Sequence, residues 1–572
     1  MKGDREVRRP PPGSRTTATS REASAAVTAC AGALVGAAFF LVVLRLGSVL
    51  RPSNTSWLMG WDWSVGYMGW RFFRVEPWAW PPARIAGLLH PVGTTVGFVD
   101  ALPVLALPFK ALRVLLPGTF QYVGAFLFLC YVAQGVFGSL LLRLLTPGLW
   151  RQAAGAALFV LSPALLFRLG HVSLSTHALL LAGIWAYARA AMGGPEAVLL
   201  WPVLCALAGG LHPYIALLVE ALAFADVLRA RFVSSTVDTA GAALRVAGNV
   251  GACLAAAWLS GYLAGGASAI SSEGVGNFSM NLLSLVNPMG FSRFLPDLPV
   301  ATPGQYEGFN YAGLGGLGLF AAALAVAALK PPSGEALRRF APLLLVCGAL
   351  ALCALSPKVT LGSATLLDLP SRWFRFLAPF RSTGRLFWPM GYLLLFLSLA
   401  LLSRRCRPAF FGALLLGALV LQAADLSKRH GIVRRREGIG FETWREEWRS
   451  SLGDPAWDRL GEAARRLVLL PPTRCQEQPD ACIVLADFAV RHQLTFNSGL
   501  AGHLDARVLA PAEEEARAAL REGRPDSRTI YLSDARALED VRDSRETVCR
   551  ELDRVAVCVA QGSSLAGLLG AR

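Results

Sequence analysis

The residues best suited to chemistry lie in one stretch, 57–100, where a few carboxylates stand among many aromatic side chains. It reads WLMGWDWSVGYMGWRFFRVEPWAWPPARIAGLLHPVGTTVGFVD, and its carboxylates are Asp62, Glu76 and Asp100. Asp62 stands between two tryptophans. A carboxylate held among indoles at a membrane surface suits a general base that acts on a lipid-borne substrate. Asp62 is therefore the first candidate for a catalytic residue, and Asp100 is the second.

The same stretch predicts a helix that begins close to Asp62. Trp63, Tyr67, Trp70 and Arg74 recur at helical spacing. Trp and Tyr gather where a bilayer meets water, because their rings are apolar and their N–H or O–H groups need polar partners, so we expect this stretch to lie along the membrane surface. A structural role for Asp62 stays open, since Asp is a favoured N-cap residue and capping is compatible with catalysis.

Side chains that could bind an anionic substrate collect in several other segments. Arg381 and Arg385 lie in FRSTGR, just before an apolar run. A charge near membrane depth costs roughly 2.5 to 3.5 kcal/mol, so these arginines imply an anionic partner or a wet cavity, and we expect them to bind a lipid phosphate through their planar guanidinium groups. The alternative is that they extend to lipid headgroups and anchor the next span. The other candidate substrate-binding residues are Arg71, Arg74, His90, His171, His212, Tyr214, Tyr306 and Glu307.

No cofactor is predicted. His171, His177 and His212 could ligate a metal only if the fold brought them together, and we favour structural or substrate-binding roles for them. A divalent cation is an alternative that the sequence does not favour. Glu220, within LLVEALAFAD, is an intramembrane carboxylate that marks either a polar interior or a hydrogen bond between helices, and we favour the hydrogen bond.

The composition is that of a multi-pass membrane protein. Of the 572 residues, 54% are hydrophobic and only 16% are charged, which is too apolar for a set of soluble domains. The net charge of +16 would suit nucleic-acid binding, but basic and acidic residues nearly balance after residue 430, so the excess belongs to the membrane part. Basic loops and anionic lipid explain that excess, and no nucleic-acid partner is expected.

About eleven membrane spans are expected within residues 25–429, preceded by a disordered cytoplasmic tail at 1–24. The first run, 25–50, is interpreted as a retained signal anchor, and a large first outer loop follows at 51–120. The other expected spans are the runs at about 121–145, 151–169, 173–192, 199–211, 213–229, 244–265, 311–329, 339–355, 384–403 and 408–425, with a re-entrant or interfacial segment at 101–116.

Charged loops predict which side of the membrane each segment faces. Lys and Arg in short loops favour the cytoplasmic side, so the opposite side receives the stretch 57–100, the segments that hold the other candidate residues, and everything after residue 430. The basic residues expected on the cytoplasmic side are Arg143, Arg151, Arg189, Arg229, Arg231, Arg245, Lys330, Arg338, Arg339, Arg404, Arg405 and Arg407.

Residues 430–572 predict a soluble α/β domain. Charge density becomes ordinary there, and the segments Arg466-LVLL, Cys482-IVLADF and Arg554-VAVCVA are predicted as strands. Its four cysteines indicate two disulfides in an exported domain, and we favour Cys475 with Cys482 and Cys549 with Cys558, although four cysteines permit three pairings. A zinc site is the alternative, but neither pair has the two-residue spacing of a zinc knuckle.

Four segments together resemble an uncharacterised group of bacterial multi-pass proteins placed near the GT-C glycosyltransferases. They are GWDWSVGYMGWRFFR, the run from His90-Pro91 to GFVDALPVLALPFK, SMNLLSLVNPMGFSRFLPDLP with QYEGFNY, and FRSTGRLFWP. The similarity covers about residues 50–390, and the remainder resembles the variable soluble domain that such proteins often carry. The resemblance implies a fold with many helices and a catalytic carboxylate in the first outer loop, a position that corresponds to Asp62.

The resemblance also implies an activity. Such enzymes transfer a sugar from a polyprenyl-phosphate carrier, here to an envelope glycan or lipid acceptor on the outer face of a bacterial inner membrane. In an inverting reaction, Asp62 would remove a proton from the acceptor hydroxyl, whose oxygen would attack the sugar C1 opposite the departing lipid phosphate. A general base contributes about 10² to 10⁴ in rate, and cations on the leaving phosphate add electrostatic stabilisation.

Two other classes of function are open to this sequence. A lipid or glycan transporter, or a flippase, could use Glu220 and the outer arginines as a pathway. Transporters often carry paired repeats with broken helices at matching positions, and the interruptions at 101–116 and 199–211 do not mirror each other. The other class is a non-catalytic scaffold for envelope assembly, whose outer carboxylates would tolerate substitution.

Overall fold

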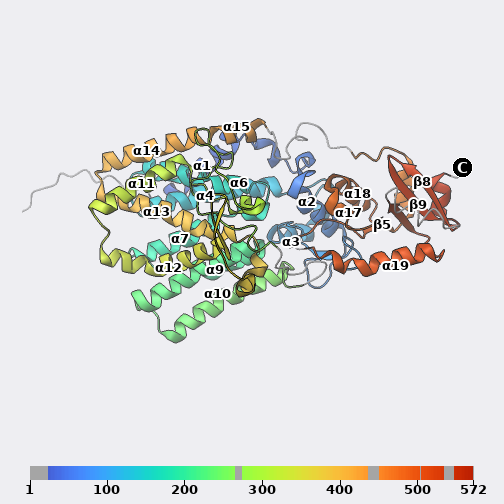
Figure 1. Ribbon diagram of the computed structural model, residues 1–572, viewed down its shortest axis with the longest axis horizontal. Coiled ribbons are helices and arrows are strands. Elements are labelled where there is room, and N and C mark those ends of the chain that lie inside the picture. The colour runs from blue at the N-terminus through green and yellow to red at the C-terminus, as the bar shows by residue number, and fades with distance from the viewer. Residues whose placement is uncertain (1–23, 265–273, 436–449, 503, 534–545, 571–572) are drawn as a thin grey trace, which may run out of the picture.

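The computed structural model describes residues 24–264, 274–435, 450–502, 504–533 and 546–570. A bundle of helices fills one end of the molecule and a sheet-containing domain fills the other, with α2 (Trp61–Val75) and α3 (Pro103–Ala111) between them (Figure 1). The tail predicted at residues 1–24 lies outside the described residues, except for Ser24. The division into a helical part and a smaller mixed domain agrees with the predicted fold class.

The bundle contains six helical segments that are long and apolar enough to cross a membrane, judged by length and composition over the described residues. They are Ala25–Val43, Val123–Arg143, Thr239–Leu259, Gly334–Leu355, Thr383–Arg405 and Pro408–Asp425. The protein is therefore a membrane protein with several apolar helices. The helices of this part are α1 Ala25–Ala38, α4 Val123–Arg143, α5 Leu149–Val160, α6 Pro163–Phe167, α7 Ala178–Ala191, α8 Leu200–Leu211, α9 Pro213–Leu228, α10 Thr239–Leu259, α11 Gly313–Leu329, α12 Gly334–Leu355, α13 Trp388–Arg405, α14 Pro408–Asp425 and α15 Ser427–Arg435.

The expected number of eleven spans is not confirmed, because several apolar runs form shorter helices. Pro163 divides the run at 151–169 into α5 and α6, since proline cannot donate the backbone hydrogen bond that would continue the first helix. The run at 173–192 begins with a 3-10 turn, and α7 starts only at Ala178. Helices α8 and α11 are apolar but shorter than the six spanning segments.

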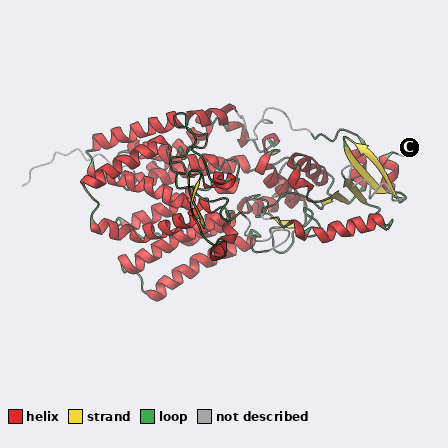
Figure 2. Ribbon diagram, in the orientation of Figure 1, coloured by secondary structure: helices red, strands yellow, loops and turns green. Residues whose placement is uncertain are grey.

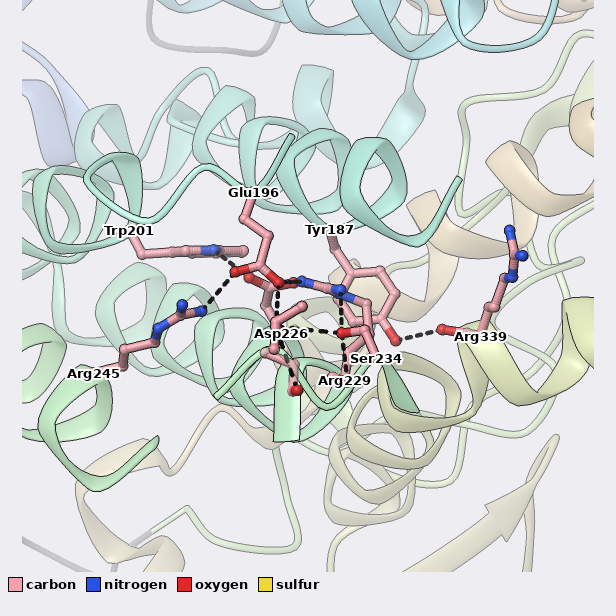
Figure 3. A network of polar contacts seen from close by, with 10 residues as sticks. Tyr187, Glu196, Trp201, Asp226, Arg229, Ser234, Arg245 and Arg339 are labelled. Carbon is pink, nitrogen blue, oxygen red and sulfur yellow. Dashed lines mark hydrogen bonds and ion pairs between the residues drawn. The ribbon is translucent and has the colours of Figure 1, made fainter. Parts of the chain in front are cut away.

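A buried polar network joins the C-terminal ends of α7 and α9 to the N-terminal ends of α8, α10 and α12 (Figure 3). Arg229 Nε donates to Asp226 Oδ1 at 2.8 Å, and Trp201 Nε1 donates to Asp226 Oδ2 at 2.9 Å. Glu196 accepts from both Arg229 and Arg245, at 3.1 and 3.0 Å. Three of the basic residues predicted to lie on the cytoplasmic side, Arg229, Arg245 and Arg339, therefore lie close to one another in the fold.

The tryptophans of the stretch 57–100 are divided between the interior and the surface of the protein. Trp57, Trp63 and Trp70 are buried, whereas Trp78 and Trp80 are exposed. Their indole N–H groups find partners within the protein: Trp63 donates to Leu169 O at 3.0 Å, and Trp70 to Phe120 O at 3.1 Å. The polar atoms of Trp63 and Trp70 are therefore satisfied within the protein, while the position of the stretch along a membrane surface stays a prediction.

The C-terminal domain holds a five-stranded sheet with the order β6-β5-β7-β9-β8 (Figure 2). β5 is parallel to both β6 and β7, while β9 is antiparallel to β7 and β8. Its elements are α16 Ala456–Ala463, β5 Arg466–Leu470, α17 Arg474–Glu477, α18 Pro479–Arg491, β6 Thr495–Phe496, α19 Ala510–Arg521, β7 Thr529–Ser533, β8 Thr547–Leu552, β9 Val555–Ala560 and α21 Ser564–Leu569. Two hairpins lie outside this sheet, β1 Arg84–Ile85 with β2 Thr94–Thr95 and β3 Lys358–Leu361 with β4 Ala364–Asp368.

Two of the three predicted strands are present, β5 and β9, but the strand predicted at 482–488 is wrong. This segment lies within α18, which begins with Pro479 at its first turn, where proline costs no hydrogen bond. Its buried residues include Cys482, Ile483, Leu485, Ala486, Phe488, Ala489 and Val490. The apolar run therefore forms a buried helix, a case that periodicity alone does not separate from a buried strand.

The disulfides have the pairing that we favoured. Cys475 is bonded to Cys482 across α17 and α18, and Cys549 is bonded to Cys558 between neighbouring strands β8 and β9.

The domain boundary predicted at residue 430 falls inside α15, so the chain does not leave helical structure there.

Candidate functional site

One cavity of about 570 Å³ lies where the bundle, the stretch 57–100 and the C-terminal domain meet. It collects nine of the twelve candidate catalytic and substrate-binding residues, although these are spread over more than half of the chain. The nine are Asp62, Asp100, His171, His212, Tyr214, Tyr306, Glu307, Arg381 and Arg385. The structure thus brings carboxylates, imidazoles and guanidinium groups into a single cavity.

Asp62 reaches the cavity from the first turn of α2. Gly60 is the N-cap residue and Asp62 is the second residue of the helix, so the reading of Asp62 as an N-cap is wrong. A negative charge in the first turn is stabilised by the backbone N–H groups at the helix N-terminus. The Asp62 side chain is 51% exposed, so its carboxylate is open to a ligand in the cavity.

His171 lies beside this carboxylate, with its Nε2 3.1 Å from Asp62 Oδ2. Burial in the cavity wall lowers the pKa of His171 more than the charge on Asp62 raises it. We therefore treat the imidazole as neutral at neutral pH, with Nε2–H donating to Asp62 and Nδ1 left as an acceptor. The sequence named both residues but gave no sign of the pair, because His171 enters from the turn that follows α6.

Two glycines on α2 let the loop with Asp100 approach the helix. A Cβ on Gly66 would lie 2.8 Å from Asp100 O, and a Cβ on Gly69 would lie 2.2 Å from a methyl carbon of Val99. Asp100 has φ +52°, a left-handed conformation that Asp and Asn adopt more readily than most residues. Its Oδ1 is buried without a hydrogen-bond partner in the described part of the chain. Burial raises the pKa of Asp100 to about 7, and the charge on Asp62 adds to the rise.

Asp100→Asn is expected to flatten the pH dependence of stability. A raised pKa means that the folded protein holds the proton more tightly than the unfolded chain, so stability is greatest at low pH and falls as pH rises from about 4 to about 7. Asn cannot ionise. Between pH 5 and pH 8, the free energy of unfolding of the variant should therefore fall by roughly 2 kcal/mol less than that of the wild type, as measured by thermal unfolding of the purified proteins. The exposed Asp368 supplies the control, Asp368→Asn. If the free energy of unfolding depended on pH in the same way in the wild type and in Asp100→Asn, the raised pKa of this carboxyl group would be contradicted.

Glu307 lies in the cavity wall between two guanidinium groups. Arg168 Nη1 is 2.7 Å and Arg385 Nη2 is 2.9 Å from its Oε2, and all three side chains are less than 10% exposed. Burial alone would raise the pKa of Glu307, but Arg168 and Arg385 together hold it well below its usual range. The cluster therefore keeps one net positive charge inside the protein.

A second close contact between glycines assembles this cluster. A Cβ on Gly384 would lie 2.3 Å from Gly308 Cα, so the two backbones touch only because both residues lack a side chain. Gly308 follows Glu307 and Gly384 precedes Arg385, and their contact sets the two charged residues side by side. In the sequence, the glycines of QYEGF and FRSTGR are the signal that could have pointed to this pair.

Arg381 is the cation of the cavity that is not committed to Glu307. Its guanidinium carbon lies 5.7 Å from the ring centre of Phe278. The backbone beside it is fixed by Tyr214, whose hydroxyl accepts from Ser382 N at 2.7 Å, and His212 Nδ1 in turn accepts from Tyr214 N at 3.1 Å. His212 and Tyr214 therefore hold the arginine segment in place, while Tyr306, which is half exposed, faces the cavity directly.

An apolar groove of about 400 Å³ runs between α9 and α10 and meets the cavity. Four residues line both spaces: Phe98, Pro213, Tyr262 and Pro379. Exposed apolar side chains of the groove include Val250, Leu254 and Leu263. Within it, Glu220 Oε1 is buried without a hydrogen-bond partner in the part of the chain that the structure describes, beside the thiols of Cys205 and Cys253. These thiols belong to the neighbouring helices α8 and α10 and form side-chain hydrogen bonds with the Glu220 carboxyl group, so the favoured contact between helices is present.

Three residues predicted to bind substrate do not line the cavity. Arg71 pairs with Asp487 of the C-terminal domain. Arg74 donates to four main-chain carbonyls between residues 113 and 118. His90 is tied to the C-terminal domain through its backbone, with N donating to Phe496 O at 2.9 Å. The structure therefore does not bring these three residues to the cavity. Among the described residues, no group of three or more His, Cys, Asp or Glu side chains is arranged to hold a metal ion.

The chain matches the two domain models of one protein family. The family described as domain of unknown function DUF6311 matches residues 33–427, and the DUF6311 C-terminal domain matches residues 456–560. The protein belongs to this family, whose two domains together cover the helical bundle and the sheet-containing domain. A comparison with curated proteins gave no match.

Proposed function

We propose that this protein is an inverting glycosyltransferase, which moves a sugar from a polyprenyl-phosphate carrier to an envelope glycan or lipid acceptor. The observation that carries the proposal is the cavity, where Asp62 and its partner His171 share one space with Arg381 and Arg385, next to an apolar groove. A base, cations and a path for a lipid chain are the three elements that such a transfer needs.

In the proposed reaction, the Asp62 carboxylate takes the proton from an acceptor hydroxyl. The hydroxyl oxygen bonds to the sugar C1 while the bond from C1 to the phosphate oxygen breaks, and the electron pair leaves with the polyprenyl phosphate. His171, donating to Asp62 Oδ2, keeps the other carboxylate oxygen directed at the acceptor. Arg381 and the residual positive charge of the Glu307 cluster stabilise the leaving phosphate.

The groove supports a lipid-linked donor in particular. Its lining is apolar apart from Glu220, and it opens from the polar cavity between two helices with exposed apolar side chains. An isoprenoid chain buried there would gain about 25 cal/mol for each Å² of apolar surface removed from water. The phosphate at the end of that chain would then lie in the cavity, within reach of the arginines.

Arg381→Gln should weaken donor binding by at least about tenfold, or about 1.4 kcal/mol. The reason is that Arg381 lines the cavity and forms no ion pair among the described residues, so its charge is free for a phosphate. The sequence predicted that both Arg381 and Arg385 bind the phosphate. Because Arg385 forms an ion pair with Glu307, we now expect this role of Arg381 alone. Binding of undecaprenyl phosphate to the purified protein measures the effect, with Arg372→Gln as control, because Arg372 is exposed in the same loop. Equal affinity in all three proteins would favour the headgroup-anchoring role instead.

The proposed location is a bacterial inner membrane, with the N-terminus in the cytoplasm and the C-terminal domain in the periplasm. Two disulfides in that domain support an oxidising compartment, and the clustered basic residues support a cytoplasmic face at the opposite helix ends. A reporter fused after Gly431 should be active only outside the cytoplasm. Activity restricted to the cytoplasm would reverse the orientation.

A lipid or glycan transporter is the second candidate function, and Glu220 is the observation in its favour. An unpartnered carboxylate oxygen in a membrane groove is typical of substrate and proton pathways. A transporter would move an unchanged lipid across the bilayer and would form no new glycosidic bond.

Mass spectrometry of lipid-linked sugars and surface glycans, in cells with and without the gene, separates the two functions. A transferase predicts that cells without the gene accumulate the sugar-loaded carrier and lack one sugar on an envelope glycan or lipid. A transporter predicts glycan structures of unchanged linkage in altered amount. Identical profiles in both strains would contradict both functions.

A further inference from the structure

The C-terminal domain is attached to the first outer loop by main-chain hydrogen bonds. Phe496 N donates to Gly87 O at 2.7 Å and Phe496 O accepts from His90 N at 2.9 Å, so the end of β6 continues as a parallel bridge to that loop. Gly502 N donates to Phe98 O at 2.6 Å, next to the cavity. Hydrogen bonds of this kind fix the register of the two segments, so the domain has a defined position beside the cavity.

Side chains strengthen the same attachment. Asp487, which is only 5% exposed, pairs with Arg71 of α2 and with Arg491 of its own helix. One apolar core also runs through both parts, since Leu88 and Phe496 belong to the same buried cluster. The C-terminal domain and the outer loop are therefore packed as one body around one side of the cavity.

Among the residues that the structure describes, the wall that this domain adds to the cavity carries no charged side chain. It consists of Pro479, at the start of α18, and the segment Leu500, Ala501 and Gly502, which follows β6. In the described part of the chain, the charged groups that line the cavity come from the other walls, formed by α2, by the loops at the ends of the bundle helices and by residues 97–100. The described C-terminal domain thus contributes an uncharged wall, and the rest of the protein contributes the charged walls.

We infer that the C-terminal domain forms the acceptor side of the cavity, and that residues 500–502 select a neutral carbohydrate by its shape. This inference rests on the proposed function. The donor phosphate and chain are provided for by Arg381 and by the groove, both within the bundle. A charged acceptor against the uncharged wall would lose its hydration without gaining a partner, whereas a sugar ring presents C–H faces that pack on such residues.

The test is a bulky substitution in this wall. Ala501→Trp fills part of the cavity, and Ala510→Trp is the matched control, because Ala510 is exposed at the start of α19 and does not line the cavity. Transfer is measured in liposomes from the sugar-lipid extract of the producing cells to fragments of their envelope, at increasing fragment concentration. Undecaprenyl phosphate binding is measured on the same preparations, as a check of folding and of the donor site.

Ala501→Trp should raise the apparent KM for envelope fragments at least about tenfold and leave undecaprenyl phosphate binding unchanged, while Ala510→Trp should behave as wild type. Should Ala501→Trp lose undecaprenyl phosphate binding, Leu500→Ala replaces it, with a changed KM for fragments again expected. An unchanged KM in every wall variant of an active protein would overturn the inference alone. No transfer by the wild type would overturn the proposed function, and this inference with it.

Discussion

Asp62→Asn is expected to lower the rate of sugar transfer by at least about 10², the lower limit for the loss of a general base. The carboxylate is half exposed to the cavity and accepts a hydrogen bond from His171, so it is held in place and open to an acceptor. Asn keeps the size of the side chain and an oxygen that can accept from His171, but it cannot take a proton. The variant should therefore insert normally and bind undecaprenyl phosphate as the wild type does.

The matched control is Asp100→Asn, which alters a second carboxyl of the same cavity. The Oδ1 atom of Asp100 is buried, whereas the Asp62 side chain is half exposed, so an acceptor reaches Asp100 less readily and we expect a smaller loss of activity than at Asp62. If Asp62→Asn kept near-normal turnover and Asp100→Asn lost most of its activity, Asp100 would be the general base instead of Asp62. Full activity in both variants would contradict the proposed mechanism.

Glu307→Gln should destabilise the protein by about 3 to 5 kcal/mol, the usual cost of removing one partner from a buried ion pair. Glu307 is the common partner of Arg168 and Arg385, and the substitution would leave two buried guanidinium groups without a counter-charge. Thermal unfolding of the purified protein measures the loss. The pKa of Glu307 lies well below its usual range, so the stabilisation is complete at neutral pH and is lost only as pH falls through that low value.

Glu335→Gln is the control for this prediction, since it removes an exposed ion pair with Arg339 in the first turn of α12. Exposed pairs contribute about 0 to 1 kcal/mol, so this variant should unfold close to the wild-type temperature. Equal and small effects in the two variants would show that the Glu307 cluster does not stabilise the fold. A large effect on Glu307→Gln alone would confirm that the cluster fixes the arginine segment of the cavity wall.

The sequence identified most of the candidate residues, because charged and aromatic side chains are conspicuous in a chain that is otherwise apolar. Nine of them meet in one cavity, since the ends of successive helices return to the same side of the bundle. What the residue types could not reveal is the pairing. Whether Arg385 binds a substrate or Glu307 depends on a contact between Gly308 and Gly384, which lie in segments far apart in the chain.

Errors in the prediction have local physical causes. Arg71 and His90 looked available because the position of the C-terminal domain against the outer loop cannot be derived from either segment alone. Trp63 and Trp70 were expected at a membrane surface, but both are buried, and internal carbonyl groups accept hydrogen bonds from their indoles. The expected eleven spans are not confirmed, because prolines such as Pro163 divide runs that hydropathy joins, and six helical segments among the described residues are long and apolar enough to cross a membrane.

The most direct test of the account is transfer by the purified protein in liposomes that contain the sugar-lipid extract of the producing cells and envelope fragments as acceptor. Mass spectrometry follows both products. The account predicts that free polyprenyl phosphate appears in a one-to-one ratio with newly glycosylated acceptor, that the configuration at the sugar C1 is inverted, and that Asp62→Asn forms neither product at a comparable rate. Intact sugar-lipid and unmodified acceptor after prolonged incubation with the folded wild-type protein would contradict it.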